Sequence, residues 1–79
     1  MIKLISVKPL ENYTLELEFY NEEKRIFDVK PYLSFGIFQE LKDIAYFKNV
    51  STQFDSISWQ NDQDFSPETL YLKSRPAGK

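Results

Sequence analysis

Residues 59–71 constrain the fold most, because they encode the end of a strand, a turn and the start of a helix in that order. Ser66 is a favourable N-cap, since its hydroxyl can accept a hydrogen bond from an unpaired amide of the first helical turn. Pro67 suits the first helical position, where its missing amide costs nothing and its fixed φ is already helical. Phe65 and Leu70 have the spacing of a hydrophobic staple across this cap. All of these features concern architecture rather than activity.

Composition limits what the chain can do. Its 79 residues predict a single small domain over residues 1–74 and a flexible tail over residues 75–79, with enough apolar (42%) and aromatic (16%) content for a globular fold. The absence of cysteine and histidine removes disulfides, thiolate metal sites and the commonest acid–base group at neutral pH. The net charge of -2 makes direct nucleic-acid binding unexpected. With no apolar run of membrane length and no secretory signal pattern, we expect a soluble, cytoplasmic protein that binds neither membrane nor cofactor.

Three β-rich segments open the chain. Residues 2–7 form the first, and Pro9 marks its end or a sheet edge, because proline cannot donate to a strand ladder. Residues 13–20 alternate strictly between apolar and polar side chains, which predicts a strand with one face on the core and one in water. Residues 25–29 return as a third strand after a polar loop.

The loop between the second and third strands sets their register, because a slip of one residue exchanges the two faces. A two-residue turn would place Ile26 opposite Leu17 and turn Phe27 outward. A three-residue loop over residues 22–24 would instead place Phe27 opposite Phe19. We prefer the three-residue loop, since it buries the larger side chains.

A helix is predicted next, with Ser34 as its N-cap and apolar residues at helical spacing as far as Ala45. Asp43 can cap a second short turn, so we expect this helix to break near Lys42. The pattern of the following segment then indicates two further strands and a last short helix.

The two further strands form a predicted hairpin around residues 55–56, which would pair Phe54 with Ile57 and Thr52 with Trp59. The predicted order is therefore strand, strand, strand, helix, strand, strand, short helix. This order indicates an α+β domain, in which a small and mostly antiparallel sheet carries a helix on one face.

Several blocks spread over nearly the whole chain form a recognisable pattern: Phe27-Asp28-Val29-x-Pro31-Tyr32-Leu33, Gly36-x-Phe38-x-x-Leu41, Phe47 and Trp59-x-Asn61-x-x-Asp64-x-x-Pro67-Glu68-x-Leu70-Tyr71. The pattern resembles domain-of-unknown-function family 2442, whose members are small prokaryotic domains. The resemblance implies an α+β fold similar to that of the N-terminal domain of a nitrosomonad protein, and it implies no activity. Because members are often encoded beside another small domain, and some are fused to a helix-turn-helix, it also implies a protein partner, as in a toxin–antitoxin-like pair.

The chain departs from the family at its most specific turn. The usual form resembles Trp-Pro-Asn-Gly-x-Asp, whereas here Gln60 replaces the proline and Asp62 replaces the glycine. Asparagine and aspartate tolerate positive φ better than other non-glycine residues. We therefore expect the turn to survive at some conformational cost.

The candidate interaction or turn residues of the last block are Trp59, Asn61, Asp64, Pro67, Glu68 and Tyr71. Asp62, Asp64 and Glu68 could together offer carboxylate oxygens to a hard divalent cation. The spacing differs from that of a calcium loop, so we prefer a reading in which Asp64 bonds the turn backbone and Glu68 favours the positive helix start. No metal site is therefore expected.

Asp28 and a set of four aromatic residues can each be interpreted either as functional or as structural. Asp28 could act as a lone acid or base, but no partner can be placed beside it, so a turn-capping role is preferred. Four aromatic side chains could stack on single-stranded nucleic acid, but the charge around them is acidic and core packing is the better explanation. These four are Trp59, Tyr71, Tyr32 and Tyr46.

The sequence contains no assembled catalytic constellation. The preferred hypothesis is a non-enzymatic interaction or accessory domain that binds a co-encoded partner or a second copy of itself, with an uncovered edge strand as one route. The alternative is a regulatory protein that reaches nucleic acid through a partner. The third hypothesis, an enzyme or metal binder that works with carboxylates alone, has no pair of them placed together.

Overall fold

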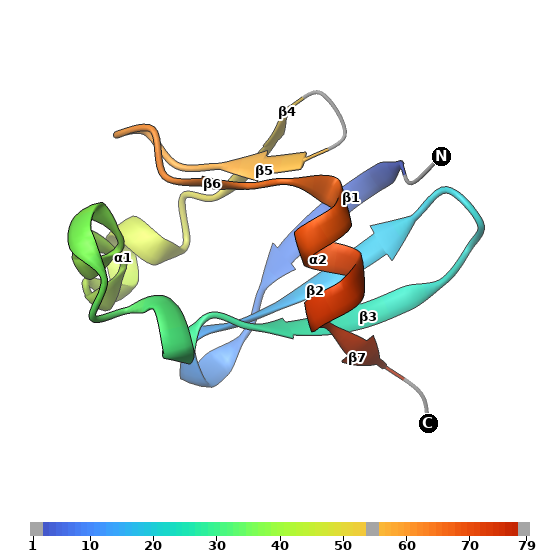
Figure 1. Ribbon diagram of the computed structural model, residues 1–79, viewed down its shortest axis with the longest axis horizontal. Coiled ribbons are helices and arrows are strands. Elements are labelled where there is room, and N and C mark those ends of the chain that lie inside the picture. The colour runs from blue at the N-terminus through green and yellow to red at the C-terminus, as the bar shows by residue number, and fades with distance from the viewer. Residues whose placement is uncertain (1–2, 54–55, 78–79) are drawn as a thin grey trace.

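The computed structural model describes residues 3–53 and 56–77 and shows an α+β fold, as the pattern predicts (Figure 1). Its strands lie in two antiparallel sheets, and its helices are short. The elements in chain order are β1 (Leu4–Pro9), η1 (Glu11–Tyr13), β2 (Thr14–Phe19), β3 (Lys24–Asp28), η2 (Lys30–Tyr32), η3 (Gly36–Lys42), α1 (Ile44–Phe47), β4 (Ser51–Gln53), β5 (Ser56–Ser58), β6 (Asp64–Phe65), α2 (Pro67–Lys73) and β7 (Arg75–Pro76).

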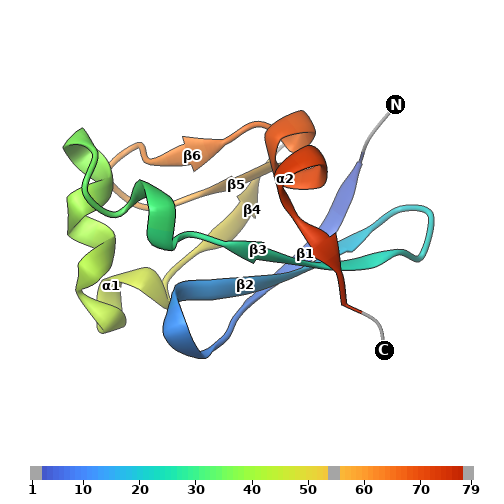
Figure 2. The ribbon, with the colours of Figure 1, turned by 60° about the horizontal axis from the view of Figure 1, so that its bottom comes forward.

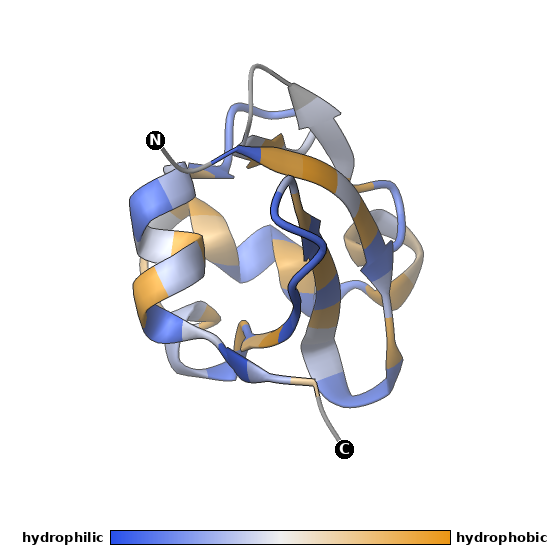
Figure 3. Cartoon of the chain, turned by 90° about the vertical axis from the view of Figure 1, so that its right-hand side faces the viewer, coloured by the Kyte–Doolittle hydropathy of each residue, from blue (hydrophilic) through white to orange (hydrophobic). Residues whose placement is uncertain are grey.

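The strands divide between two sheets, whereas the sequence pattern predicted one. The larger sheet has the order β1-β2-β3-β7 and the smaller has the order β4-β5-β6. Helix α2 lies across one face of the larger sheet, and the η3–α1 segment closes one end of the molecule (Figures 1 and 2). Apolar and polar bands alternate along α2, as expected for a helix with one buried face (Figure 3).

The register of β2 and β3 differs from the predicted one by four residues. Leu15 pairs with Phe27 and Leu17 pairs with Arg25, because the three-residue loop covers residues 20–22 instead of 22–24. The loop closes there through a bond from the Glu22 amide to the Phe19 carbonyl (2.9 Å), and Glu22 takes a φ of 68°. An even shift keeps each side chain on its face, so Phe27 is buried as predicted.

The predicted helix after the sheet is mostly a 3-10 helix followed by a single α turn. Its N-terminus is not capped by Ser34, because Phe35 is extended and takes the N-cap position, and Gly36 has a φ of 46°, so the helix starts one residue later than predicted. The predicted break near Lys42 is confirmed. The Asp43 side chain caps α1 by accepting from the amides of Ala45 (3.0 Å) and Tyr46 (3.5 Å).

The β4–β5 hairpin exists, but its register is shifted by two residues. Thr52 pairs with Ile57 rather than with Trp59. Phe54 lies outside the described residues. Because the shift is again even, Ile57 keeps its predicted face and is fully buried.

The start of α2 is as predicted. Ser66 Oγ accepts from the Thr69 amide (3.2 Å), Pro67 is the first helical residue, and both staple residues, Phe65 and Leu70, are buried. The core they join holds side chains from both sheets and from η3 and α1: Leu4, Leu15, Leu17, Phe19, Phe27, Val29, Leu41, Phe47, Ile57, Trp59, Phe65 and Leu70.

The expected C-terminal tail begins with an ordered strand. Arg75 and Pro76 pair with β3 as β7, and the Ala77 amide donates to the Lys24 carbonyl (2.9 Å). Residues 78–79 lie outside the described part of the chain. Both outer strands of the larger sheet thus carry a proline, Pro9 in β1 and Pro76 in β7, which removes a donor from each edge and disfavours pairing with another strand.

Candidate functional site

A buried glutamine holds the turn between β5 and β6. Gln63 is fully buried, and its Oε1 accepts from the Tyr46 hydroxyl (2.6 Å). Its Nε2 donates to the Ile37 carbonyl and to Glu40 Oε1, each at 2.8 Å. Every polar atom of the amide group is therefore bonded to the η3–α1 segment, which is the condition for burying it without a large cost.

Two residues of the family pattern join the same network. Asn61 Nδ2 donates to both carboxylate oxygens of Glu40 (3.0 and 2.8 Å), and its backbone amide donates to the Tyr46 hydroxyl (2.8 Å). Trp59 is buried, and its Nε1 donates to the Phe47 carbonyl (2.9 Å). We call the five residues Glu40, Tyr46, Trp59, Asn61 and Gln63 the turn clamp.

The turn itself survives without the family glycine. Asp62 takes a φ of 73°, as predicted for a residue in place of glycine, and its amide donates to the Trp59 carbonyl (3.2 Å). The Trp59 amide donates in turn to the Gln63 carbonyl (2.9 Å), which closes the turn. A side chain in this left-handed region is tolerated at some cost in aspartate.

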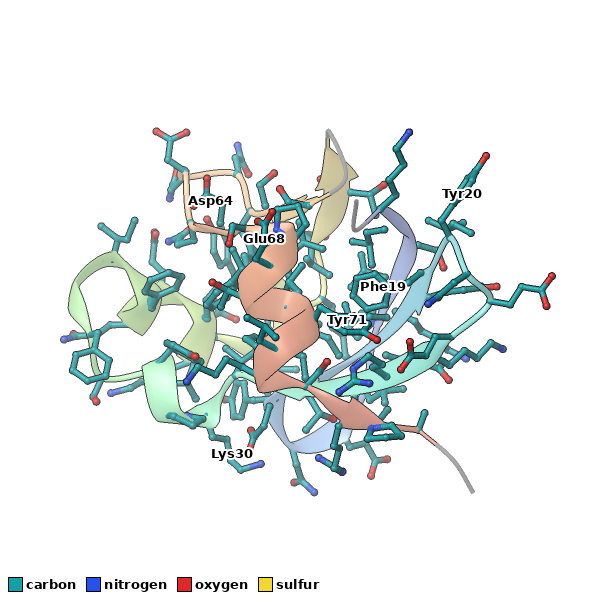
Figure 4. All side chains as sticks on the ribbon, turned by 45° about the vertical axis from the view of Figure 1, so that its right-hand side comes forward. Phe19, Tyr20, Lys30, Asp64, Glu68 and Tyr71 are labelled. Carbon is teal, nitrogen blue, oxygen red and sulfur yellow. The ribbon has the colours of Figure 1, made fainter. Side chains whose placement is uncertain are left out.

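A second cluster, the C-terminal corner, joins α2 and β7 to the β2–β3 hairpin. Arg25 lies over the Tyr71 ring (4.6 Å), donates to Ser74 Oγ and to the Ser74 carbonyl (both 2.7 Å), and pairs with Glu23 (2.5 Å). The Tyr71 hydroxyl donates to the other Glu23 oxygen (2.8 Å), while the ring packs edge-on against Phe19 (Figure 4). The Tyr71 hydrogen bond, together with Arg25, lowers the pKa of Glu23, and the same bond to Glu23 raises the pKa of Tyr71.

The three carboxylates that could have formed a cation site are all exposed. Asp62 lies in the turn, Asp64 on β6 and Glu68 in the first turn of α2. Over the residues that the structure describes, no group of three potential metal ligands forms. Glu68 lies at the helix start as predicted. The predicted bond from the Asp64 carboxylate to the turn backbone is not among the hydrogen bonds of the described residues.

Asp28 caps a turn, which confirms the preferred interpretation. Its Oδ1 accepts from the Lys30 amide (3.0 Å) and pairs with the Lys30 ammonium (3.1 Å). The four aromatic residues proposed as a stacking platform are core and rim side chains, because Trp59 is buried and the three tyrosines pack against the core. Core packing was the preferred interpretation of these side chains, and it is confirmed.

An apolar hollow lies beside α1. It has a volume of about 760 Å³ and is lined by Pro9, Leu10, Glu11, Asn12, Tyr13, Ile44, Phe47 and Lys48. The backbone at its rim is strained, since Asn12 and Tyr13 take φ values of 61° and 57°. Tyr13 is held by its ring contact with Phe47 and by donation of its hydroxyl to the Lys42 carbonyl (2.5 Å).

Large apolar side chains are exposed on the described part of the chain, and half of them lie close together in sequence. Phe35, Ile37 and Ile44 are 62%, 56% and 57% exposed and belong to the η3–α1 segment or its start. The others, Ile5, Tyr20 and Leu72, lie on three separate elements or loops. The η3–α1 end therefore combines exposed apolar side chains with the hollow, to which Ile44 belongs.

The structural roles of Gln63, Glu40 and Arg25 were not predicted from the sequence. Gln63, Glu40 and Arg25 are polar or charged residues in a turn, on a helix and on a strand, and exposure is the ordinary expectation for such residues. Apart from the Arg25–Glu23 pair, their partners lie 17 to 49 positions away, so only the tertiary fold brings them together.

Among the described residues, no helix is long and apolar enough to cross a membrane. No curated protein and no solved structure matches the chain. The profile of the family described as "Protein of unknown function (DUF2442)" matches residues 4–76, and this match takes in both clusters and the hollow. Since the match covers nearly the whole chain, the protein belongs to the DUF2442 family.

Proposed function

We propose that this protein is a non-enzymatic interaction domain that binds another protein, either a co-encoded partner or a second copy. The observation that supports it is the exposure of Phe35, Ile37 and Ile44 at the η3–α1 end, beside an apolar hollow. Exposed apolar side chains that gather at one place are typical of a binding surface. The nearby polar residues of the turn clamp are occupied in internal hydrogen bonds.

In this proposal the family pattern acts by shaping that surface. Trp59, Asn61 and Gln63 bond the η3–α1 segment through Phe47, Glu40 and Tyr46, so they hold the segment that carries the exposed apolar side chains. Pro67 starts α2, and Tyr71 ties α2 to the β2–β3 hairpin through Glu23. Asp64 and Glu68 are left free to contact a partner.

Binding through side chains is favoured over strand pairing. The outer strands of the larger sheet, β1 and β7, each contain a proline, and β1 also carries a bulge between Leu4 and Ser6. Prolines and bulges are devices that prevent an edge strand from accepting another strand.

The test is co-expression with each protein encoded beside this one, followed by size-exclusion chromatography. We expect one of them to co-elute, and we expect the double substitution Phe35→Ser and Ile37→Ser to separate the two. The control is Tyr20→Ser at the tip of the β2–β3 hairpin, which is 72% exposed but lies away from the η3–α1 segment (Figure 4). Separate elution of every neighbour, together with a chain that stays monomeric, would contradict the proposal.

A further inference from the structure

The hollow beside α1 carries one charge of each sign at its lining. Its apolar surface comes from Pro9, Leu10, Ile44 and Phe47, and the charged side chains are Glu11 and Lys48. Neither charge forms an ion pair with another described residue. A complementary surface would therefore present an apolar side chain with one carboxylate and one ammonium beside it.

Helix α2 presents such a set on a different side of the molecule. Leu72 is 74% exposed, the largest exposure among the large apolar side chains described. Glu68 lies one helical turn before it, at the i, i+4 spacing that places two side chains on one face, and Lys73 follows it directly. All three side chains are exposed.

We propose that α2 of a second copy docks at the hollow, with Leu72 entering it, Glu68 meeting Lys48 and Lys73 meeting Glu11. This inference rests on the proposed function and names the partner as the chain itself. This single contact would cover both the exposed Leu72 side chain and the apolar hollow. Both charge pairs join opposite signs across the contact.

The contact joins two different surfaces, so it is heterologous. Figures 1 and 2 place α1 at one end of the molecule and α2 away from it. One contact therefore leaves a pair with an unused hollow on one copy and an unused α2 on the other. Association therefore continues beyond the pair as the concentration rises. The contact is small, so it should be seen only at high protein concentration.

The experiment is sedimentation equilibrium of the natural chain, of Ile44→Asp and of Leu72→Asp, each alone over a wide concentration range. The weight-average mass of the natural chain should rise above 9.4 kDa as the concentration increases. Each variant should have an association constant lower by at least about tenfold. Both positions are exposed, so both variants should keep the natural far-UV circular dichroism and urea midpoint. Tyr20→Asp is the matched control and should associate as the natural chain does.

Mixing the two variants is the decisive step. Leu72→Asp keeps an intact hollow and Ile44→Asp keeps an intact α2, so an equimolar mixture should restore association but stop at pairs. In the same way, Lys48→Glu and Glu68→Lys should each weaken association alone and restore it when mixed. A mixture of Ile44→Asp and Leu72→Asp that stays monomeric, or a natural chain that stays monomeric at millimolar concentration, would overturn the inference.

The outcomes separate this inference from the proposed function. A monomeric chain that still co-elutes with a neighbouring protein overturns the self-contact and leaves the interaction domain standing. Self-association that is lost in each variant alone and restored when the two variants are mixed, without any co-eluting neighbour, supports the second copy as the partner. Association that Ile44→Asp and Leu72→Asp both leave unchanged overturns this contact, although the chain would still bind itself through another surface.

Discussion

The turn clamp and the C-terminal corner both hold distant segments of the chain together, but they use different kinds of hydrogen-bonding groups. Each ties a late segment of the chain to an earlier one, the turn to η3–α1 and the α2–β7 end to the β2–β3 hairpin. The clamp centres on Gln63, a neutral side chain that is fully buried. The corner centres on the ion pair of Arg25 with Glu23, whose side chains are 13% and 30% exposed.

This difference predicts how much each region contributes to stability. A buried amide that loses its partners leaves them unpaired in the interior, and each unpaired group costs free energy. A partly exposed ion pair exchanges its bonds for bonds with water when it is broken, and salt screens it. The clamp should therefore dominate stability, while the corner should make stability depend on pH and salt.

Gln63→Leu should have the largest effect. The leucine leaves the Tyr46 hydroxyl and the Ile37 carbonyl without their partner, so we expect a loss of about 3 kcal/mol in the free energy of unfolding. Urea unfolding followed by tryptophan fluorescence measures it, because Trp59 lies in the same clamp.

Gln60→Leu is the matched control, since Gln60 lies in the same turn but is exposed. It should change the free energy of unfolding by less than about 0.5 kcal/mol. Equal effects of the two substitutions would show that the burial of Gln63 does not determine its contribution to the free energy of unfolding.

The N-cap of α2, the helix that leads from one region to the other, should have the next largest effect. Ser66→Ala removes the bond to the Thr69 amide and should cost about 1 kcal/mol. Ser34→Ala is the control, because Ser34 has the sequence signature of a cap but makes no capping bond. Thermal unfolding of both variants compares them, and a similar cost at Ser34 would contradict the helix start seen at Gly36.

Asp62→Gly should stabilise the turn. Glycine adopts the observed φ of 73° without steric cost, and this gain is partly offset by the greater freedom of glycine in the unfolded chain. We expect a net gain of about 0.5 kcal/mol, measured as a higher urea midpoint. Asp64→Gly, at an exposed strand position, should act in the opposite direction, and a loss of stability in Asp62→Gly would show that the carboxylate itself supports the turn.

The pH dependence of the corner should be the smallest effect. Because folding lowers the pKa of Glu23, its contribution is present above the unfolded pKa of about 4.3 and is lost as the pH falls through the lower folded value. Because folding raises the pKa of Tyr71, its contribution is present below the unfolded pKa of about 10 and is lost as the pH rises through the folded value.

Glu23→Gln should flatten the stability curve at both ends, since one substitution removes both interactions. The measurement is the urea midpoint between pH 3 and pH 11, with Glu22→Gln as the control that keeps the contact between Tyr71 and Glu23. Identical pH profiles for the two variants would remove the corner from the account of pH dependence.

Local signals predicted local structure well. Ser66, Pro67 and Asp43 act where the sequence places them, because a cap involves residues only two or three positions apart. Ser34 has the same signature, but Gly36 takes a left-handed conformation that starts the helix later. The face of each strand was predictable from alternation, whereas the exact register was set by a loop conformation at Glu22 that the pattern does not encode.

Distant contacts could not be predicted in this way. Nothing around Gln63 or Arg25 in the sequence indicates that Tyr46 or Ser74 will meet them, because those pairings appear only when the sheets and helices have packed. The same holds for the strand at Arg75, whose pairing with Ile26 depends on the direction in which α2 leaves the corner. The hollow is also a tertiary feature, since its lining comes from β1, η1 and α1.

Salt dependence tests the contrast between clamp and corner most directly. The free energy of unfolding is measured for the natural chain, Gln63→Leu and Glu23→Gln at about 0.1 M and about 1 M NaCl, where the screening length falls from about 10 Å to about 3 Å. We predict that the cost of Gln63→Leu stays at about 3 kcal/mol at both concentrations while the cost of Glu23→Gln falls toward zero. A cost of Gln63→Leu that disappears in high salt, or a cost of Glu23→Gln that equals it at both concentrations, would contradict the account.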